Sequence, residues 1–99
     1  MAKYDVYRNP AGSGFLIDVQ SDHLMEFSTR VVIPLLIRTA KPIPVRRLTP
    51  ILPVDGVDHI LATQLISAVP KAILKHPIDN LRHHFAAITG AIDMLFQGF

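Results

Sequence analysis

Residues 30–37 read Arg-Val-Val-Ile-Pro-Leu-Leu-Ile, a nearly unbroken apolar run that is rich in branched side chains. Such a run predicts a β-strand covered on both faces, because a strand with one face in water alternates apolar and polar residues. Pro34 interrupts the run and has no N–H group to donate to a neighbouring strand. We therefore expect this strand to bulge at Pro34 or to lie at the edge of its sheet.

Further strand signals lie on both sides of this run. Residues 4–6 and 15–20 alternate apolar and polar side chains around the turn formers of residues 9–14, which predicts an N-terminal hairpin with Asp18 on its polar face. Downstream, Asp55-Gly56 gives the strongest short-range hairpin signal, with arms at residues 51–54 and 57–63. Residues 66–69 predict one more short strand.

In the last quarter of the chain, the spacing of the apolar residues changes to that of an α-helix. Apolar residues recur there at steps of three or four, which predicts a helix from about residue 80 to 96 whose buried stripe is Leu81, Phe85, Ile88, Ile92 and Leu95. Asp79 or Asn80 would cap its start, and Gly98 marks its end. Gly90 costs a helix about 1 kcal/mol relative to alanine, which suggests a close approach by another chain element. The order predicts a mainly β fold, a small barrel or curled sheet with one C-terminal α-helix, as a single domain of residues 1–99.

The composition limits the class of protein. With 99 residues, 49% of them hydrophobic, and a mean hydropathy of +0.33, the chain has too little interior to hide its apolar surface, so we expect a homodimer or another partner. No run approaches the roughly 20 apolar residues of a membrane span. The lack of cysteine excludes disulfides and thiol chemistry, and residues 1–5 lack the apolar core of a signal peptide. We therefore expect a cytoplasmic protein.

The spacing of the polar residues does not indicate a catalytic or metal site. His83 and His84 are adjacent, so on a helix their side chains point about 100° apart and do not converge on one ion. Asp18 fits structural hydrogen bonding at a strand end better than a catalytic carboxylate pair with Asp22 or Glu26. A basic cluster could contact phosphates of DNA or RNA, but without interleaved aromatic residues it fits a solvated loop better; it comprises Arg38, Lys41, Arg46 and Arg47. We predict an interaction protein without cofactor or metal, not an enzyme.

Two segments in combination resemble a known family. Residues 18–22 read Asp-Val-Gln-Ser-Asp, and residues 30–35 read Arg-Val-Val-Ile-Pro-Leu. This pair is similar to the signature of the CcdB family. Weaker matches follow in the same order, at Leu48-x-Pro50, at Ala68-Val69-Pro70 and over the closing residues 91–99. The resemblance covers essentially the whole chain.

The resemblance implies a fold and a function. It implies a homodimeric, SH3-like barrel of the CcdB/MazF type with a C-terminal helix. It also implies the toxin of a type II toxin–antitoxin system, which binds the A subunit of DNA gyrase and traps gyrase with its DNA cleaved. A cognate CcdA-like antitoxin would neutralise the toxin, and operator DNA would be bound only by the toxin–antitoxin complex.

The resemblance also assigns residues to these partners. Gyrase would be contacted by the C-terminal tip and by one residue of the segment after the first motif, namely Asp93, Phe96, Gln97, Gly98, Phe99 and Leu24. Antitoxin would be contacted by Arg8, Asp18, Val19 and Asp22.

The C-terminal tip departs from the family pattern. Toxic CcdB proteins end in Trp-Gly-Ile, whereas this chain ends in Gln97-Gly98-Phe99. An interfacial tryptophan is a typical hot spot, and a loss of about 2 kcal/mol corresponds to roughly thirty-fold in affinity. His23 is a second polar substitution near the same presumed site. Two alternatives therefore stay open: a CcdB-fold protein that binds antitoxin without poisoning gyrase, and a MazF-like ribonuclease that uses Arg30 or Arg46.

Overall fold

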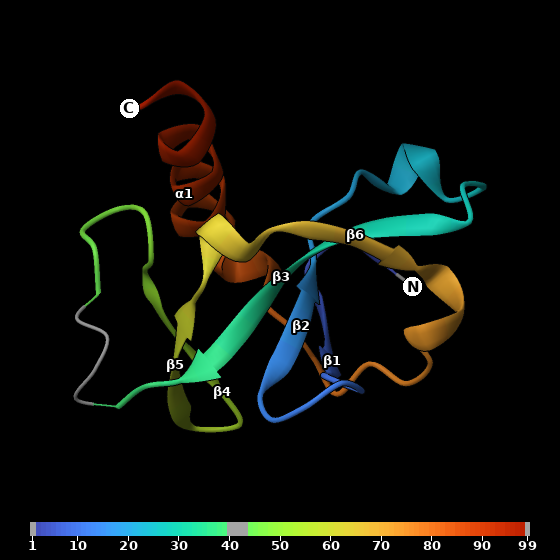
Figure 1. The fold of residues 1–99 in the computed structure, drawn as a ribbon, viewed down its shortest axis with the longest axis horizontal. Coiled ribbons are helices and arrows are strands. Elements are labelled where there is room, and N and C mark those ends of the chain that lie inside the picture. The colour runs from blue at the N-terminus through green and yellow to red at the C-terminus, as the bar shows by residue number, and fades with distance from the viewer. Residues whose placement is uncertain (1, 40–43, 99) are drawn as a thin grey trace.

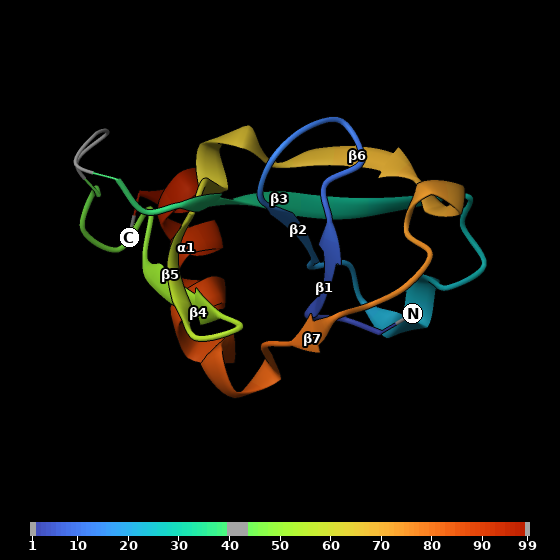
Figure 2. The same ribbon diagram turned by 90° about the horizontal axis from the view of Figure 1, so that it is seen from below.

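The structure is a computed structural model that describes residues 2–39 and 44–98. Its strands are β1 (Asp5–Arg8), β2 (Phe15–Asp18), β3 (Thr29–Ile37), β4 (Ile51–Val54), β5 (Val57–Leu61), β6 (Ser67–Pro70) and β7 (Asp79–Asn80). The α-helix is α1 (Phe85–Gln97), and the 3₁₀ turns are η1 (Asp22–Leu24), η2 (Thr63–Leu65), η3 (Lys71–Ile73) and η4 (Arg82–His84). The predicted fold class is confirmed: a mainly β, half-barrel sheet is followed by one C-terminal helix in the part of the chain that the structure describes (Figures 1 and 2).

Strand β3 is the centre of the sheet, whose strands run in the order β4-β5-β3-β2-β1-β7. On one edge β3 pairs with β2, and its other edge is shared between β6, which pairs with residues 29–32, and β5, which pairs with residues 35–37. Pro34 lies where the second edge changes partner, and its carbonyl accepts a hydrogen bond from Ala62 N at 2.9 Å. Strand β3 therefore does not lie at the edge of the sheet, and it does not have to bulge. The missing N–H group of Pro34 falls in the gap between β6 and β5, where no strand needs that donor.

Both predicted hairpins are confirmed. Strands β1 and β2 pair antiparallel in a register that joins Val6 to Ile17. Strands β4 and β5 pair from Val54↔Val57 outward, and between them Asp55 and Gly56 have φ values of +52° and +76°. Positive φ at both central residues is the geometry of a type I′ turn, which matches the right-handed twist of the two arms.

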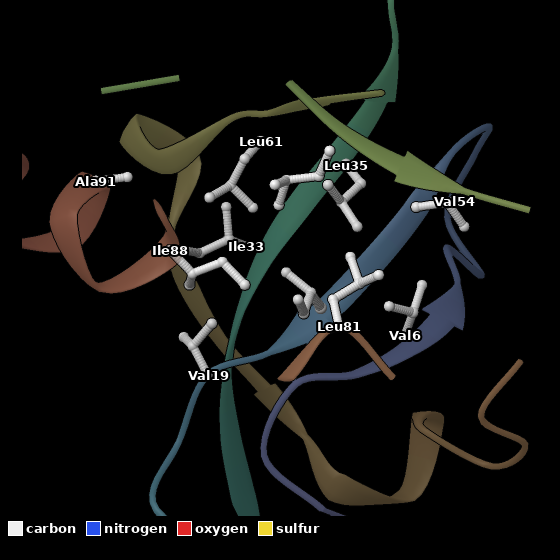
Figure 3. Close-up of a cluster of buried hydrophobic side chains, with 11 residues drawn as sticks. Val6, Val19, Ile33, Leu35, Val54, Leu61, Leu81, Ile88 and Ala91 are labelled. Carbon is white, nitrogen blue, oxygen red and sulfur yellow. The ribbon is translucent and has the colours of Figure 1, made fainter. Parts of the chain in front are cut away.

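The main core lies between the curled sheet and α1. Figure 3 shows its buried side chains, which come from both hairpins, from β3 and from the C-terminal quarter of the chain: Val6, Ile17, Val19, Ile33, Leu35, Leu52, Val54, Leu61, Leu81, Ile88 and Ala91. A smaller cluster on the other face of the sheet contains Tyr7, Leu16, Val32 and Leu74. Both faces of β2 are therefore covered. The prediction that Asp18 lies on the polar face of a half-buried strand is wrong, because Asp18 is 0% exposed.

The C-terminal helix is shorter than predicted. Residues 82–84 form η4, whose first residue Arg82 donates its backbone N–H to Asn80 Oδ1 at 2.9 Å, and α1 begins only at Phe85. Phe85 is 58% exposed, so it does not belong to the buried stripe, and Ala91 lies there instead. A side chain at Gly90 would meet nothing within 4 Å, so no described element approaches it closely. The helix ends as expected at Gly98, with φ +80°.

No helix within residues 2–39 and 44–98 has the length and apolar character to cross a membrane.

Gly14 provides a test of the N-terminal hairpin. It has φ +84°, and a Cβ built on it would lie 2.5 Å from the backbone oxygen of Leu35 in β3. Gly14→Ala should therefore lower the free energy of unfolding by at least about 2 kcal/mol, measured by urea denaturation. Gly12→Ala is the matched control in the same loop, because nothing lies within 4 Å of its position; it should change stability by less than about 0.5 kcal/mol. Equal effects would contradict the packing of this loop on β3.

Candidate functional site

A buried ion pair joins β2 to β3. Arg30 Nε lies 2.8 Å from Asp18 Oδ2, and Arg30 Nη2 donates to Asp18 Oδ1 at 3.0 Å, so the contact is bidentate. Both side chains are 0% exposed. Burial raises the pKa of the Asp18 carboxyl. Hydrogen bonds from the Arg30 side chain and from the Gln20 backbone N–H oppose that rise. Asp18 therefore forms structural hydrogen bonds at the end of its strand.

The other residues of the Asp-Val-Gln-Ser-Asp segment extend this network. Gln20 accepts a hydrogen bond from Val31 N at 2.9 Å and donates to Leu24 O at 3.2 Å, so one side chain links β3 to the residues after the motif. Ser21 Oγ accepts from His23 N at 3.2 Å, at the start of η1. Asp22 Oδ1 accepts from Lys3 N at 2.8 Å. The segment thus fixes the N-terminus and the following loop to the sheet.

The loop that this network holds exposes large apolar side chains. Over residues 22–28, Leu24 is 41% exposed, Met25 47% and Phe27 58%. Lys71 anchors the far side of the loop, since its Nζ donates to Met25 O at 2.7 Å and its backbone N to Ser28 O at 2.8 Å. The sequence prediction included Leu24 but missed Met25 and Phe27. The sequence signal that could have indicated this exposed surface is the presence of three large apolar residues in a segment without helical or strand periodicity.

The predicted tip residues lie at the free end of α1. Asp93, Phe96, Gln97 and Gly98 are exposed, and Phe96 reaches 69% exposure. Phe99 lies outside the described residues. Figure 1 shows the end of α1 and the loop with η1 on the same upper side of the molecule but toward opposite ends of its long axis. One chain therefore does not bring the loop with η1 together with the tip.

The residues predicted to contact antitoxin separate into two kinds. Arg8 is exposed, and the Asp22 side chain is 55% exposed, so both can meet a partner. Asp18 is 0% exposed and Val19 9% exposed, so their side chains hold the strand end in place and are not available for contact. The assignment of these four residues to an antitoxin stays a prediction.

The remaining polar candidates do not form a reaction centre. Arg30 is buried, which removes it from any RNA-cleaving role, whereas Arg46 and Arg47 are exposed. Arg38 lies 4.0 Å from Asp58, and Lys41 falls outside the described residues. Within the described part of the chain, no group of three histidine or carboxylate side chains could hold a metal ion.

The buried phenol of Tyr7 gives the stability of the fold a measurable pH dependence. Tyr7 is 2% exposed and donates a long hydrogen bond of 3.5 Å to Asp5 Oδ2. Burial and the nearby Asp5 carboxylate raise the pKa of Tyr7 from 10.0 to about 12. The neutral phenol therefore stabilises the fold fully below pH 10, and that contribution is lost as the pH rises toward 12.

Stability should consequently fall by about 2–3 kcal/mol between pH 10 and pH 12 through this one group. Tyr7→Phe should lack that part of the alkaline loss. Urea denaturation of both proteins across this pH range measures the difference, and parallel stability curves would contradict the burial of the phenol.

Comparison with family models identifies the chain. The model described as CcdB protein matches residues 3–98. Comparison with curated proteins returns no match. The match spans the buried Asp18–Arg30 pair, the exposed loop and the end of α1, in a half-barrel sheet of the kind that the family adopts. The chain therefore belongs to the CcdB family, whose members are toxins that inhibit an enzyme and are not enzymes themselves.

Proposed function

We propose that this protein is the toxin of a type II toxin–antitoxin system and that it binds the A subunit of DNA gyrase and traps gyrase on cleaved DNA. The observation that carries the proposal is the free end of α1. A helix whose last residues are exposed, with a phenylalanine at 69% exposure, presents an apolar side chain on a rigid support. Such an aromatic residue is a typical anchor for a protein partner.

We further propose that the active form is a homodimer. The exposed loop with η1 and the end of α1 lie toward opposite ends of the long axis within one chain (Figure 1), so a single site that includes both surfaces needs a second copy. Large apolar side chains stay exposed elsewhere in the described chain as well, among them Leu36, Ile37, Val45 and Leu65. A monomer of this size rarely leaves so much apolar surface in water.

The proposal includes the remaining members of such a system. A CcdA-like antitoxin would contact Arg8 and Asp22, the exposed pair among the predicted residues. Operator DNA would be bound only by the toxin–antitoxin complex, and all of these partners act in the cytoplasm.

A specific residue favours the alternative of a CcdB-fold protein that no longer poisons gyrase. Gln97 is the last residue of α1 and stands where toxic members of the family carry tryptophan. Glutamine offers less apolar area and loses more side-chain entropy on binding. Trapping by the natural chain should therefore be weaker than trapping by a Gln97→Trp variant, by roughly thirty-fold at a difference of about 2 kcal/mol.

The test is DNA cleavage by purified gyrase with ATP, with and without the toxin. The natural chain should accumulate linear DNA, and Gln97→Trp should do so at lower concentration. Phe96→Ala should weaken trapping by at least about tenfold, whereas Phe85→Ala removes a phenylalanine that is 58% exposed at the other end of α1 and should change trapping little.

Each other outcome of this test has a defined meaning. Trapping by Gln97→Trp alone would establish the disarmed alternative. The absence of trapping by every variant would contradict the proposal, and degradation of added RNA would replace it with ribonuclease activity.

A further inference from the structure

A groove lies between α1 and the segment that leads into β4. It has a volume of about 320 Å³ and is lined by Arg47, Pro50, Ala86, Ala87 and Gly90. Figure 1 shows this segment in light green beside the helix. Apart from one arginine, the described residues that line the groove are small or rigid, and none of them is acidic, aromatic or long and apolar.

The loop that carries Arg47 is closed by two hydrogen bonds. Thr49 N donates to Val45 O at 2.9 Å, and Val45 N donates to Thr49 Oγ1 at 2.7 Å. Thr49 is buried, whereas Arg46 and Arg47 between them are exposed. Arg47 has φ +69°, a left-handed conformation that persists in a residue with a side chain only where the surrounding structure holds it. The loop therefore presents its two arginines in a fixed arrangement.

These two arginines and Arg82 form what we call the basic surface. Arg82 is exposed in η4, immediately before α1. Within residues 2–39 and 44–98, no carboxylate oxygen lies within 4.0 Å of the Arg46, Arg47 or Arg82 side chains. The only acidic residue in the sequence of α1 is Asp93, one turn beyond Gly90. The positive charge of the basic surface is therefore available to an external anion.

We propose that the basic surface binds the phosphate backbone of duplex DNA without reading its sequence. An arginine can pair with a phosphate through two parallel N–H groups, and each such contact releases counterions from the DNA. A single strand needs aromatic rings for stacking, which the described lining of the groove does not offer, whereas a duplex needs none. The groove also offers no long apolar side chain among its described residues to anchor a peptide.

The inference rests on the proposed function only for the origin of the DNA. Both proposed complexes, the one with gyrase and the one on the operator, bring the toxin next to duplex DNA. Contacts to phosphates position a protein but carry no sequence information, so recognition of the operator still requires the toxin–antitoxin complex. DNA binding is measured without gyrase or antitoxin, so its failure and the failure of gyrase trapping are distinguishable.

Fluorescence anisotropy of the natural chain with a short fluorescein-labelled DNA duplex that lacks operator sequence provides the test. Binding should be saturable at low salt. The logarithm of the association constant should fall against the logarithm of the salt concentration with a slope of about −2.7, which is about 0.9 for each of three phosphates. One strand of the same DNA should bind more weakly, and polyglutamate should displace the duplex less readily than unlabelled duplex does.

Neutral variants locate the contact. Arg46→Gln with Arg47→Gln should make the salt slope shallower by about two and weaken binding at low salt by at least about tenfold. Arg47→Gln alone should weaken binding by at least about threefold. Lys75→Gln removes one charge from an exposed residue between η3 and β7 and should change affinity less than about twofold. Thermal unfolding checks that each variant is folded, and Arg82→Gln, outside the loop, should weaken binding as Arg47→Gln does even if the loop variants unfold.

Three results would overturn the inference. Equal weakening by Arg47→Gln and Lys75→Gln would show that the net charge of the chain, and not the basic surface, attracts DNA. An absence of saturable binding to the duplex would remove the proposed ligand. Tighter binding of the single strand, or displacement by polyglutamate as ready as that by unlabelled duplex, would show that the surface does not select a duplex backbone.

Discussion

The buried pair of Asp18 and Arg30 is the interaction on which the rest of the structure depends. Removing two charges from water is costly, and the cost is recovered only when geometry and further hydrogen bonds are good. Here the contact is bidentate at 2.8 and 3.0 Å, and Arg30 Nη2 also donates to Gln20 O at 3.2 Å. The pair fixes the end of β2 against the start of β3, which is the central strand of the sheet.

The same pair belongs to the buried support that lies beside the exposed surfaces of the protein. Next to Asp18 in the sequence, Asp22 is hydrogen-bonded to the N-terminal segment, and Gln20 and Ser21 are hydrogen-bonded to the loop with η1. The loop can then expose Leu24, Met25 and Phe27, because its backbone is held by Gln20 on one side and by Lys71 on the other. The residues that mark the family in the sequence are therefore mostly buried supports, and the partner surfaces lie beside them.

Much of the fold was predictable, because its signals are local. Both hairpins and the end of α1 at Gly98 follow from turn residues and short periodic patterns. The errors arise where a distant part of the chain decides the outcome. Asp18 looks solvated from its own strand, but its partner lies twelve residues away and both faces of β2 are covered. Pro34 is tolerated inside the sheet because β5 and β6 divide the facing edge.

The candidate sites were predictable only in part. The position of Phe96 and Gln97 at the end of α1 was predictable, but the exposure of Phe85 depends on where the helix begins, which is only after η4. Met25 and Phe27 have no periodic pattern to mark them.

Asp18 and Arg30 act as one buried structural unit. Urea denaturation of Asp18→Asn, of Arg30→Met and of the double variant measures their coupling directly. Each single change should cost about 3–5 kcal/mol, because it leaves one buried group without its partner, and the double variant should lose far less than the sum of the two. Additive losses would contradict the account, because they would show that the two side chains contribute independently.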